Sequence, residues 1–192
     1  MLKGSPFLFS TYMKIKIISL AFGAMLMLFS CTDKSKNAMQ QTSVEQQNTA
    51  QPTEILDDFS LPDVQRDFKT LSEEIAKHDM TVIDFWASWC GPCRNEMPTM
   101  VKLRQSYNEK QLGIIGVSLD TDYNKWTAAF DEMQMNWPQF SELKGWDSYI
   151  VQKLGINSIP YTIIVDKDRN ILAKGLRGKE LERYIESKIK QP

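Results

Sequence analysis

The sequence predicts an α/β sandwich, in which helices flank a central sheet. Apolar segments typical of strands alternate along the chain with segments whose apolar residues recur at helical spacing. The chain then closes with two strands and a helix. Its 192 residues, 42% of them hydrophobic, accommodate one globular domain comfortably but two only with difficulty. No internal repeat is visible.

Four strands are expected. Residues 81–87 and 112–119 are nearly continuous apolar runs, which is typical of strands that are covered on both faces. Tyr161–Asp166 and Ile171–Lys174 are separated by the turn-forming residues 167–170. These last two strands are therefore expected to form a hairpin.

Three helices are expected between and after these strands. They cover residues 93–107, 123–133 and 179–189. The second and third segments carry apolar residues at helical spacing, such as Leu181 and Ile185 in the third. Each of these two helices should therefore bury one apolar stripe.

The amino terminus resembles an export signal with a lipid-attachment site. Lys14 and Lys16 precede an uncharged apolar run at residues 17–29, which is shorter than the roughly twenty residues of a bilayer-spanning helix. The run ends in the letters LFSC, which resemble a bacterial lipoprotein processing site. Residues 1–31 are thus expected to be a signal peptide, with Cys31 as the lipid-attachment residue. The alternative is an uncleaved single-pass anchor with an incidental cysteine.

The next segment, residues 32–53, contains mainly small polar residues and no aromatic residue. Such a segment buries too little apolar surface to fold, so it is expected to be a flexible linker. A domain at residues 54–192 follows. This organisation predicts a protein of the bacterial cell envelope that is lipid-anchored to a membrane and faces the periplasm.

Charge and cysteine content narrow the class of function. The formal net charge is −1 and no segment concentrates lysine and arginine, so no nucleic-acid partner is expected. Three cysteines in a chain of this size do not make a disulfide scaffold. Zinc needs four ligands, and beyond the Cys90–Cys93 pair only Cys31 and His78 remain, so no metal site is expected.

The Cys-Gly-Pro-Cys motif at residues 90–93 is the candidate reactive centre. Cys90 follows a predicted strand at the start of a helix, where unpaired backbone N–H groups and the helix dipole favour a thiolate. Cys93 lies one turn along, near enough to attack a mixed disulfide formed by Cys90. Pro92 suits the first helical position, because its missing N–H costs nothing there. Cys90 is therefore expected to be the exposed, attacking thiol and Cys93 the more buried, resolving one. A structural disulfide or a redox-inactive binding module are alternatives.

Two motifs resemble the thioredoxin superfamily. Residues 84–93, DFWASWCGPC, resemble the active-site segment of thioredoxins, and residues 156–160, INSIP, resemble the cis-proline loop. Pro98 matches the helix-kinking proline of that family. The resemblance covers roughly residues 55–190 and implies a thioredoxin-like fold with a central mixed sheet flanked by helices.

The chain is longer than a minimal thioredoxin between Cys90 and Pro160. The extra length falls around residues 120–150, as an insertion between the active-site helix and the cis-proline loop. With Glu96, this insertion resembles the membrane-tethered TlpA/ResA branch. That branch commonly carries a glutamate at this position but often has asparagine at the Asp84 position, so this chain departs slightly from its pattern.

The resemblance implies a thiol–disulfide oxidoreductase that reduces disulfide-containing envelope proteins. Electrons would come from a membrane thiol transporter of the DsbD/CcdA kind, and no cofactor is needed beyond the redox-active disulfide Cys90–Cys93. Two alternatives remain. One is a thiol peroxidase of the peroxiredoxin type, although Ile83 and Ala87 replace the Pro and Thr of the peroxiredoxin motif. The other is a redox-inactive lipoprotein that uses the fold to bind a partner.

Two carboxylates are candidate catalytic residues. Asp84 is a charge within an apolar strand, which is costly unless it is neutral or paired. Beneath the cysteine pair, it could take the proton from Cys93 and return it. The alternative is a solvent-facing edge position. Glu96, which is expected on the first turn of the helix, either acts at the site or stabilises the helix dipole.

The substrate should meet a surface around the first cysteine. Pro160 is predicted to be catalytic, together with Cys90, Cys93, Asp84 and Glu96. In the cis form it would turn the backbone of Ile159 outward beside Cys90, to pair with an extended substrate segment. The alternative is an ordinary trans proline in a turn. The predicted substrate-binding residues are Trp89, Gly91, Pro92 and Ile159. The aromatic residues of the insertion, Trp137, Trp146 and Tyr149, are expected to pack in the core, and the alternative is that they line a groove. His78 is expected on the surface.

Overall fold

The computed structural model describes residues 54–189. The predicted signal peptide at residues 1–31, with its lipid-attachment residue Cys31, and the predicted linker at residues 32–53 lie outside the described residues. In the part of the chain that is described, no helix is both long and apolar enough to cross a membrane.

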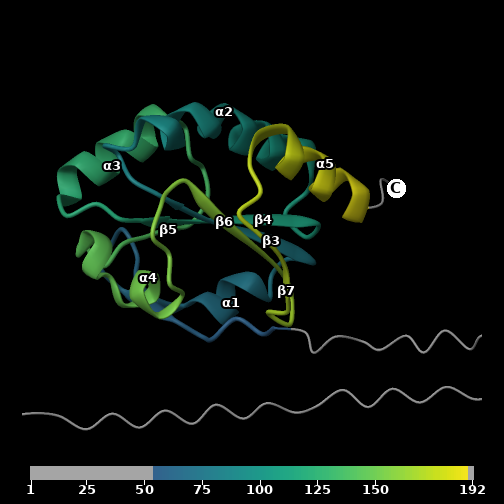
Figure 1. Ribbon diagram of the computed structural model, residues 1–192, viewed down its shortest axis with the longest axis horizontal. Coiled ribbons are helices and arrows are strands. Elements are labelled where there is room, and N and C mark those ends of the chain that lie inside the picture. The colour runs from purple at the N-terminus through teal and green to yellow at the C-terminus, as the bar shows by residue number, and fades with distance from the viewer. Residues whose placement is uncertain (1–53, 190–192) are drawn as a thin grey trace, which may run out of the picture. The chain divides into compact units, whose positions relative to one another are not determined.

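A mixed five-stranded sheet forms the centre of the domain, in the order β5-β4-β3-β6-β7 (Figure 1). The strands are β3 (Met80–Trp86), β4 (Leu112–Ser118), β5 (Gln139–Phe140), β6 (Tyr161–Asp166) and β7 (Ile171–Lys174). β3, β4 and β5 run parallel, whereas β6 is antiparallel to both β3 and β7. This is the thioredoxin-like α/β fold that the sequence predicts.

Helices cover both faces of the sheet. They are α1 (Leu71–Ile75), α2 (Gly91–Ser106), α3 (Tyr123–Glu132), α4 (Tyr149–Lys153) and α5 (Gly178–Lys188), with a short 3₁₀ helix η1 (Gly145–Asp147). Figure 1 shows α2, α3 and α5 over one face and α1 and α4 over the other. Every residue of β3 and β4 is therefore buried, which explains their continuous apolar sequences.

The beginning of the described chain covers both edges of the sheet. Ile55 forms a bridge to Asn170 beside β7, and Asp63 forms a bridge to Phe140 of β5. Between these bridges begins a small antiparallel sheet of β1 (Ser60–Pro62) and β2 (Phe68–Thr70). These contacts occupy positions at the two edges of the sheet, where unpaired strand groups could otherwise pair with another chain.

The helix that carries the cysteine pair begins earlier than the sequence suggests. It starts at Gly91, so the prediction that it begins at residue 93 is wrong by two residues. Pro92 is consequently the second helical residue and not the first. Pro98 lies inside the helix, as the resemblance implies. His78, expected on the surface, is half-buried against Gly113 and hydrogen-bonds the Glu109 carbonyl.

Candidate active site

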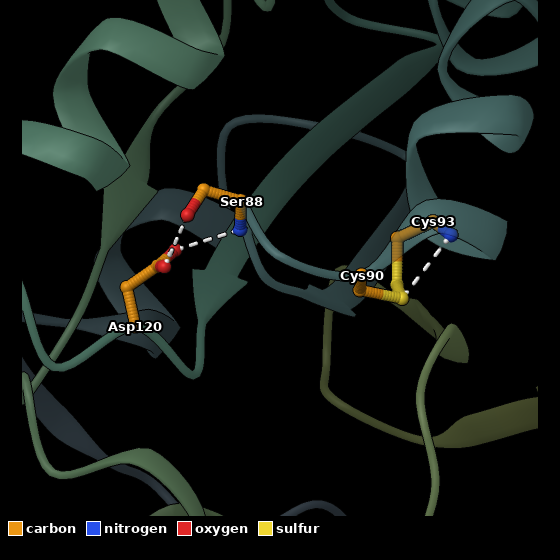
Figure 2. The surroundings of a disulfide bond; sticks show 4 residues. All are labelled: Ser88, Cys90, Cys93 and Asp120. Carbon is orange, nitrogen blue, oxygen red and sulfur yellow. Dashed lines mark hydrogen bonds between the residues drawn. A yellow bond between two sulfur atoms is a disulfide. The ribbon is translucent and has the colours of Figure 1, made fainter.

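The cysteine pair forms a disulfide at the start of α2, with an S–S distance of 2.01 Å (Figure 2). Cys90 is the N-cap residue of the helix, and its Sγ accepts a hydrogen bond from the backbone N–H of Cys93 at 3.2 Å. This sulfur therefore occupies the position where free N–H groups and the dipole of a 16-residue helix favour negative charge. The same place would stabilise a Cys90 thiolate after reduction.

Cys90 is more exposed than Cys93, as the sequence predicts, but neither side chain is open to solvent. Cys90 is 5% exposed and Cys93 0%. The expectation that Cys90 is exposed is thus wrong for the disulfide form. The backbone N–H of Cys90 donates a hydrogen bond to the Ala87 carbonyl at 3.1 Å, and this turn holds Cys90 against the buried end of β3. The neighbours of Cys90 form the protein surface beside the disulfide, because Trp89 is 57% exposed and both Gly91 and Pro92 are exposed.

The Ile159–Pro160 peptide bond is cis, as the sequence predicts. β6 begins directly after it and pairs with β3, with Tyr161 opposite Phe85. This register brings Ile159 and Pro160 to the end of the sheet where β3 leads into Cys90. Ile159 is half-buried and Pro160 is buried. The pairing of Ile159 with a substrate segment stays a prediction.

Asp84 is a buried carboxyl in the middle of the sheet. It is 1% exposed and lies between Gly116 of β4 and Thr162 of β6. Burial, followed by the negative charge of Glu96, raises the pKa of Asp84 from 3.8 to about 7. Within the described residues its Oδ2 atom has no hydrogen-bond partner. The alternative of a solvent-facing edge position is thus excluded, and the carboxyl is poised to exchange a proton near neutral pH.

Glu96 lies beyond the first turn of α2, because the helix starts at Gly91, so the expected first-turn position is wrong. Its Oε2 atom accepts a hydrogen bond from the backbone N–H of Gly178 at 2.8 Å. Gly178 is the first residue of α5, and the N-cap residue Arg177 makes no side-chain cap bond there. Glu96 therefore satisfies a free N–H group at the start of another helix while its charge acts on Asp84.

Sequence reasoning missed a polar pair beside the cysteines. Asp120 accepts hydrogen bonds from the backbone N–H of Ser88 at 2.9 Å and from Ser88 Oγ at 2.6 Å (Figure 2). A signal for it exists in the sequence, since Asp120 follows β4 just as Ser88 follows β3. The carboxyl ends of parallel strands meet at one edge of a sheet, which is where ligand sites form.

The aromatic residues of the insertion do not share one environment. Trp137 is 7% exposed, so the expectation of core packing is confirmed for it. Trp146 and Tyr149 are 40% and 63% exposed, so the same expectation is wrong for both. They lie on η1 and α4, which are short surface elements. Residues 54–189 contain no group of three or more histidine, cysteine, aspartate or glutamate side chains placed to hold a metal ion.

Comparison with known proteins agrees with this geometry. A family model described as thioredoxin-like matches residues 78–171. The thioredoxin-like protein YneN of Bacillus subtilis is 31% identical over 135 residues, which are 67% of this chain and 75% of that protein. The thiol-disulfide oxidoreductase ResA of Bacillus thuringiensis is 27% identical over 109 residues. This match covers 57% of this chain and 61% of ResA, so it leaves more than a third of ResA unmatched.

Solved structures show the same similarity. A thiol-disulfide oxidoreductase from Bacteroides fragilis superposes with a TM-score of 0.65 at 26% identity, over 70% of this chain and 98% of that structure. The thioredoxin domain of a thiol-disulfide oxidoreductase from Bacteroides vulgatus superposes with a TM-score of 0.65 at 27% identity. This match covers 72% of this chain and 97% of that structure. With a cysteine pair at disulfide distance at the start of α2, the chain belongs to the thioredoxin-like family and is a thiol–disulfide oxidoreductase.

Proposed function

We propose that this enzyme reduces disulfides of proteins in the bacterial cell envelope. The observation that carries the proposal is the Cys90–Cys93 disulfide at the helix start, bordered by exposed Trp89, Gly91 and Pro92. A surface made of exposed residues suits a disulfide that is presented by another protein. Aromatic residues are also enriched where protein surfaces meet.

The proposed reaction begins from the reduced pair. The Cys90 thiolate attacks one sulfur of the substrate disulfide, which forms a mixed disulfide and releases the other substrate sulfur as a thiolate that takes up a proton. Cys93 then loses its proton to Asp84 and attacks the Cys90 sulfur. The second substrate sulfur leaves as a thiolate and is protonated. Two electrons have passed to the substrate, and the enzyme holds the Cys90–Cys93 disulfide.

The direction of exchange follows from the residues between the cysteines. A Gly-Pro centre is the thioredoxin sequence, and thioredoxin has a potential of about −270 mV against about −120 mV for the oxidant DsbA. For two electrons that difference is about 7 kcal/mol in favour of a reductant. The enzyme must then be reduced again, and we propose a membrane thiol transporter of the DsbD/CcdA kind as the electron donor. Apart from the redox-active Cys90–Cys93 disulfide, the proposed reaction needs no cofactor.

The proposed location rests on the sequence before the domain. Lipid attachment at Cys31 would hold the protein at a membrane on the periplasmic side. A flexible linker of 22 residues at 32–53 would span roughly 25 Å, which leaves the domain free to turn towards its substrates.

A trapping experiment in a bacterium that processes lipoproteins tests the proposal. The Cys93→Ser variant of the full chain should accumulate mixed disulfides between Cys90 and envelope proteins, because the resolving thiol is missing. The double variant Cys90→Ser/Cys93→Ser is the matched control and should trap nothing. Adducts on Cys90→Ser, or adducts only with cytoplasmic proteins, would contradict the proposal.

The anchor is tested separately with a labelled fatty acid. The wild-type chain should take up the label and partition with membranes. The Cys31→Ala variant should do neither. Label on the Cys31→Ala protein would contradict lipid attachment at Cys31.

A further inference from the structure

The loop between β3 and α2, residues 87–90, is held by a buried carboxylate that the exchange reaction does not use. Asp120 is 1% exposed, and Ser88 directs both its backbone N–H and its hydroxyl at it, at 2.9 and 2.6 Å. Figure 2 shows the Ser88 side chain turned towards Asp120 and away from the disulfide. Hydrogen bonds to a carboxylate are about twice as strong as those between neutral groups.

Asp120 is itself fixed in place by the end of β4. The Ser118 hydroxyl donates to Asp120 Oδ2 at 2.6 Å and accepts from the backbone N–H of Asp120 at 2.9 Å. Ser118 is also buried, at 3% exposure. The carboxylate is therefore preorganised before Ser88 meets it, and the position of Ser88 follows from that of β4.

Trp89 lies between two anchored residues. On one side Ser88 is bound to Asp120, and on the other Cys90 is the N-cap of α2 and donates to the Ala87 carbonyl. The side chain of Trp89 is nevertheless 57% exposed. An exposed aromatic side chain whose neighbours on both sides are anchored, next to a reactive sulfur, is suited to contact the polypeptide of a substrate, since aromatic anchors carry much of the binding energy of protein interfaces.

We infer that Asp120 is a positioning residue that favours protein disulfides over small ones, because it holds Ser88 and thereby fixes Trp89 as a contact for the substrate polypeptide. This inference rests on the proposed function. The reactivity of Cys90 itself depends on the start of α2, within residues 90–93. A small disulfide needs only that sulfur, whereas a protein disulfide must also be accommodated on the adjoining surface.

The test compares two oxidants of the purified full chain, which is first reduced with dithiothreitol and then freed of it. Second-order rate constants for oxidation are measured with insulin and with oxidised glutathione, by acid quenching and alkylation of the remaining thiols. Ser88→Ala should lower the insulin rate constant about tenfold and change the glutathione rate constant less than about twofold. Asp120→Asn should act in the same direction, because its amide nitrogen cannot accept from Ser88.

Two further variants distinguish positioning from a general loss of structure. Ser88→Thr keeps a hydroxyl donor and should restore most of the insulin rate. Ser106→Ala removes a serine hydrogen bond to the Lys102 carbonyl near the end of α2 and should leave both rates unchanged. Equal losses with both oxidants, or no loss in Ser88→Ala, would overturn the inference. A reduced wild-type protein that reacts with neither oxidant would overturn the proposed function instead.

Discussion

The Glu96 carboxylate accepts a hydrogen bond from the backbone N–H of Gly178 at 2.8 Å, which joins α2 to the first residue of α5 across 82 positions of sequence. The same carboxylate raises the pKa of Asp84 in the sheet below. Glu96 thus has two effects, one on the packing of two helices and one on a buried acid. Substitution can separate them.

Glu96→Gln should lower the pKa of Asp84 while leaving the helices joined. The amide oxygen can still accept from Gly178, but the negative charge that opposes ionisation of Asp84 is gone. Burial, the larger cause, remains, so the pKa should stay above 3.8. The carboxyl ¹³C shift of Asp84, followed against pH in the oxidised protein, measures this. An unchanged pKa would show that the two carboxyls are not coupled.

Glu96→Ala should instead destabilise the fold, because the N–H of Gly178 loses its acceptor. The expected loss is about 1–2 kcal/mol for a hydrogen bond to a charged, half-buried group. Denaturant unfolding of the oxidised Ala and Gln variants beside the wild type checks it, since only the Ala variant should fall clearly below the wild type. Equal stabilities in all three would mean that this hydrogen bond contributes nothing measurable.

Asp84→Asn should stabilise the oxidised protein at alkaline pH. The pKa of Asp84 is about 7 in the folded protein and near 3.8 when unfolded, so the folded state holds the proton more tightly. Stability therefore falls as pH rises from about 4 to about 7, and ionisation costs the fold about 4 kcal/mol above that range. The neutral amide avoids this cost but retains some cost of burial, so the gain should be smaller.

The measurement is the free energy of unfolding of both oxidised proteins at several pH values. The advantage of Asp84→Asn should be largest near pH 8 and should shrink towards pH 4. Asp57→Asn, a substitution at an exposed position, is the control and should show no such trend. A constant difference between variant and wild type at every pH would mean that Asp84 has an ordinary pKa.

The main elements of the fold could be predicted because each is long enough to show a pattern. β6 and β7 have the predicted ends, and α2, although it starts two residues early, was recognisable from its position after an apolar strand. By contrast, β5 has two residues and α1 five, which is too short for any periodicity to be visible. Contacts with the rest of the domain stabilise these short elements.

The candidate site likewise contains residues that could be predicted from the sequence and residues that could not. The cysteine pair and the cis proline could be found because each lies in a local motif. The contact of Ser88 with Asp120 spans 32 positions, so its only signal in the sequence is that each residue follows a strand, and that signal becomes useful only once β3 is known to align with β4. Trp146 and Tyr149 were placed wrongly because composition alone does not distinguish a buried aromatic residue from an exposed one.

The two cysteines of the reduced protein should react with alkylating agents at different rates. Cys90 is slightly exposed and lies at the N-cap of α2, whereas Cys93 is fully buried. We therefore expect Cys90 to be modified first, by at least about tenfold, because the thiolate at a helix start is favoured. Peptide mass spectrometry after a short pulse of iodoacetamide measures the order. Faster modification of Cys93 would reverse the assignment of attacking and resolving thiols.

Asp84→Asn should also slow the step in which Cys93 attacks the mixed disulfide. With a pKa of about 7, Asp84 is ionised in a substantial fraction of molecules near neutral pH, and the proposed reaction requires this ionised form to accept the proton of Cys93. The amide cannot, so the rate constant for release of the substrate should fall about 100-fold or more, which is the lower end of the range for general base catalysis. The first attack by Cys90 should change less, because the start of α2 stabilises that thiolate.

Rapid-quench experiments with the reduced enzyme and insulin resolve the two steps, since the mixed disulfide should accumulate transiently in Asp84→Asn but not in the wild type. The rate of its decay in the wild type should rise with pH around 7 as Asp84 loses its proton. In the variant this rise should move to the higher pH at which Cys93 itself ionises. If the mixed disulfide decays equally fast in both proteins across this pH range, Asp84 takes no part in proton transfer, and its burial affects stability alone.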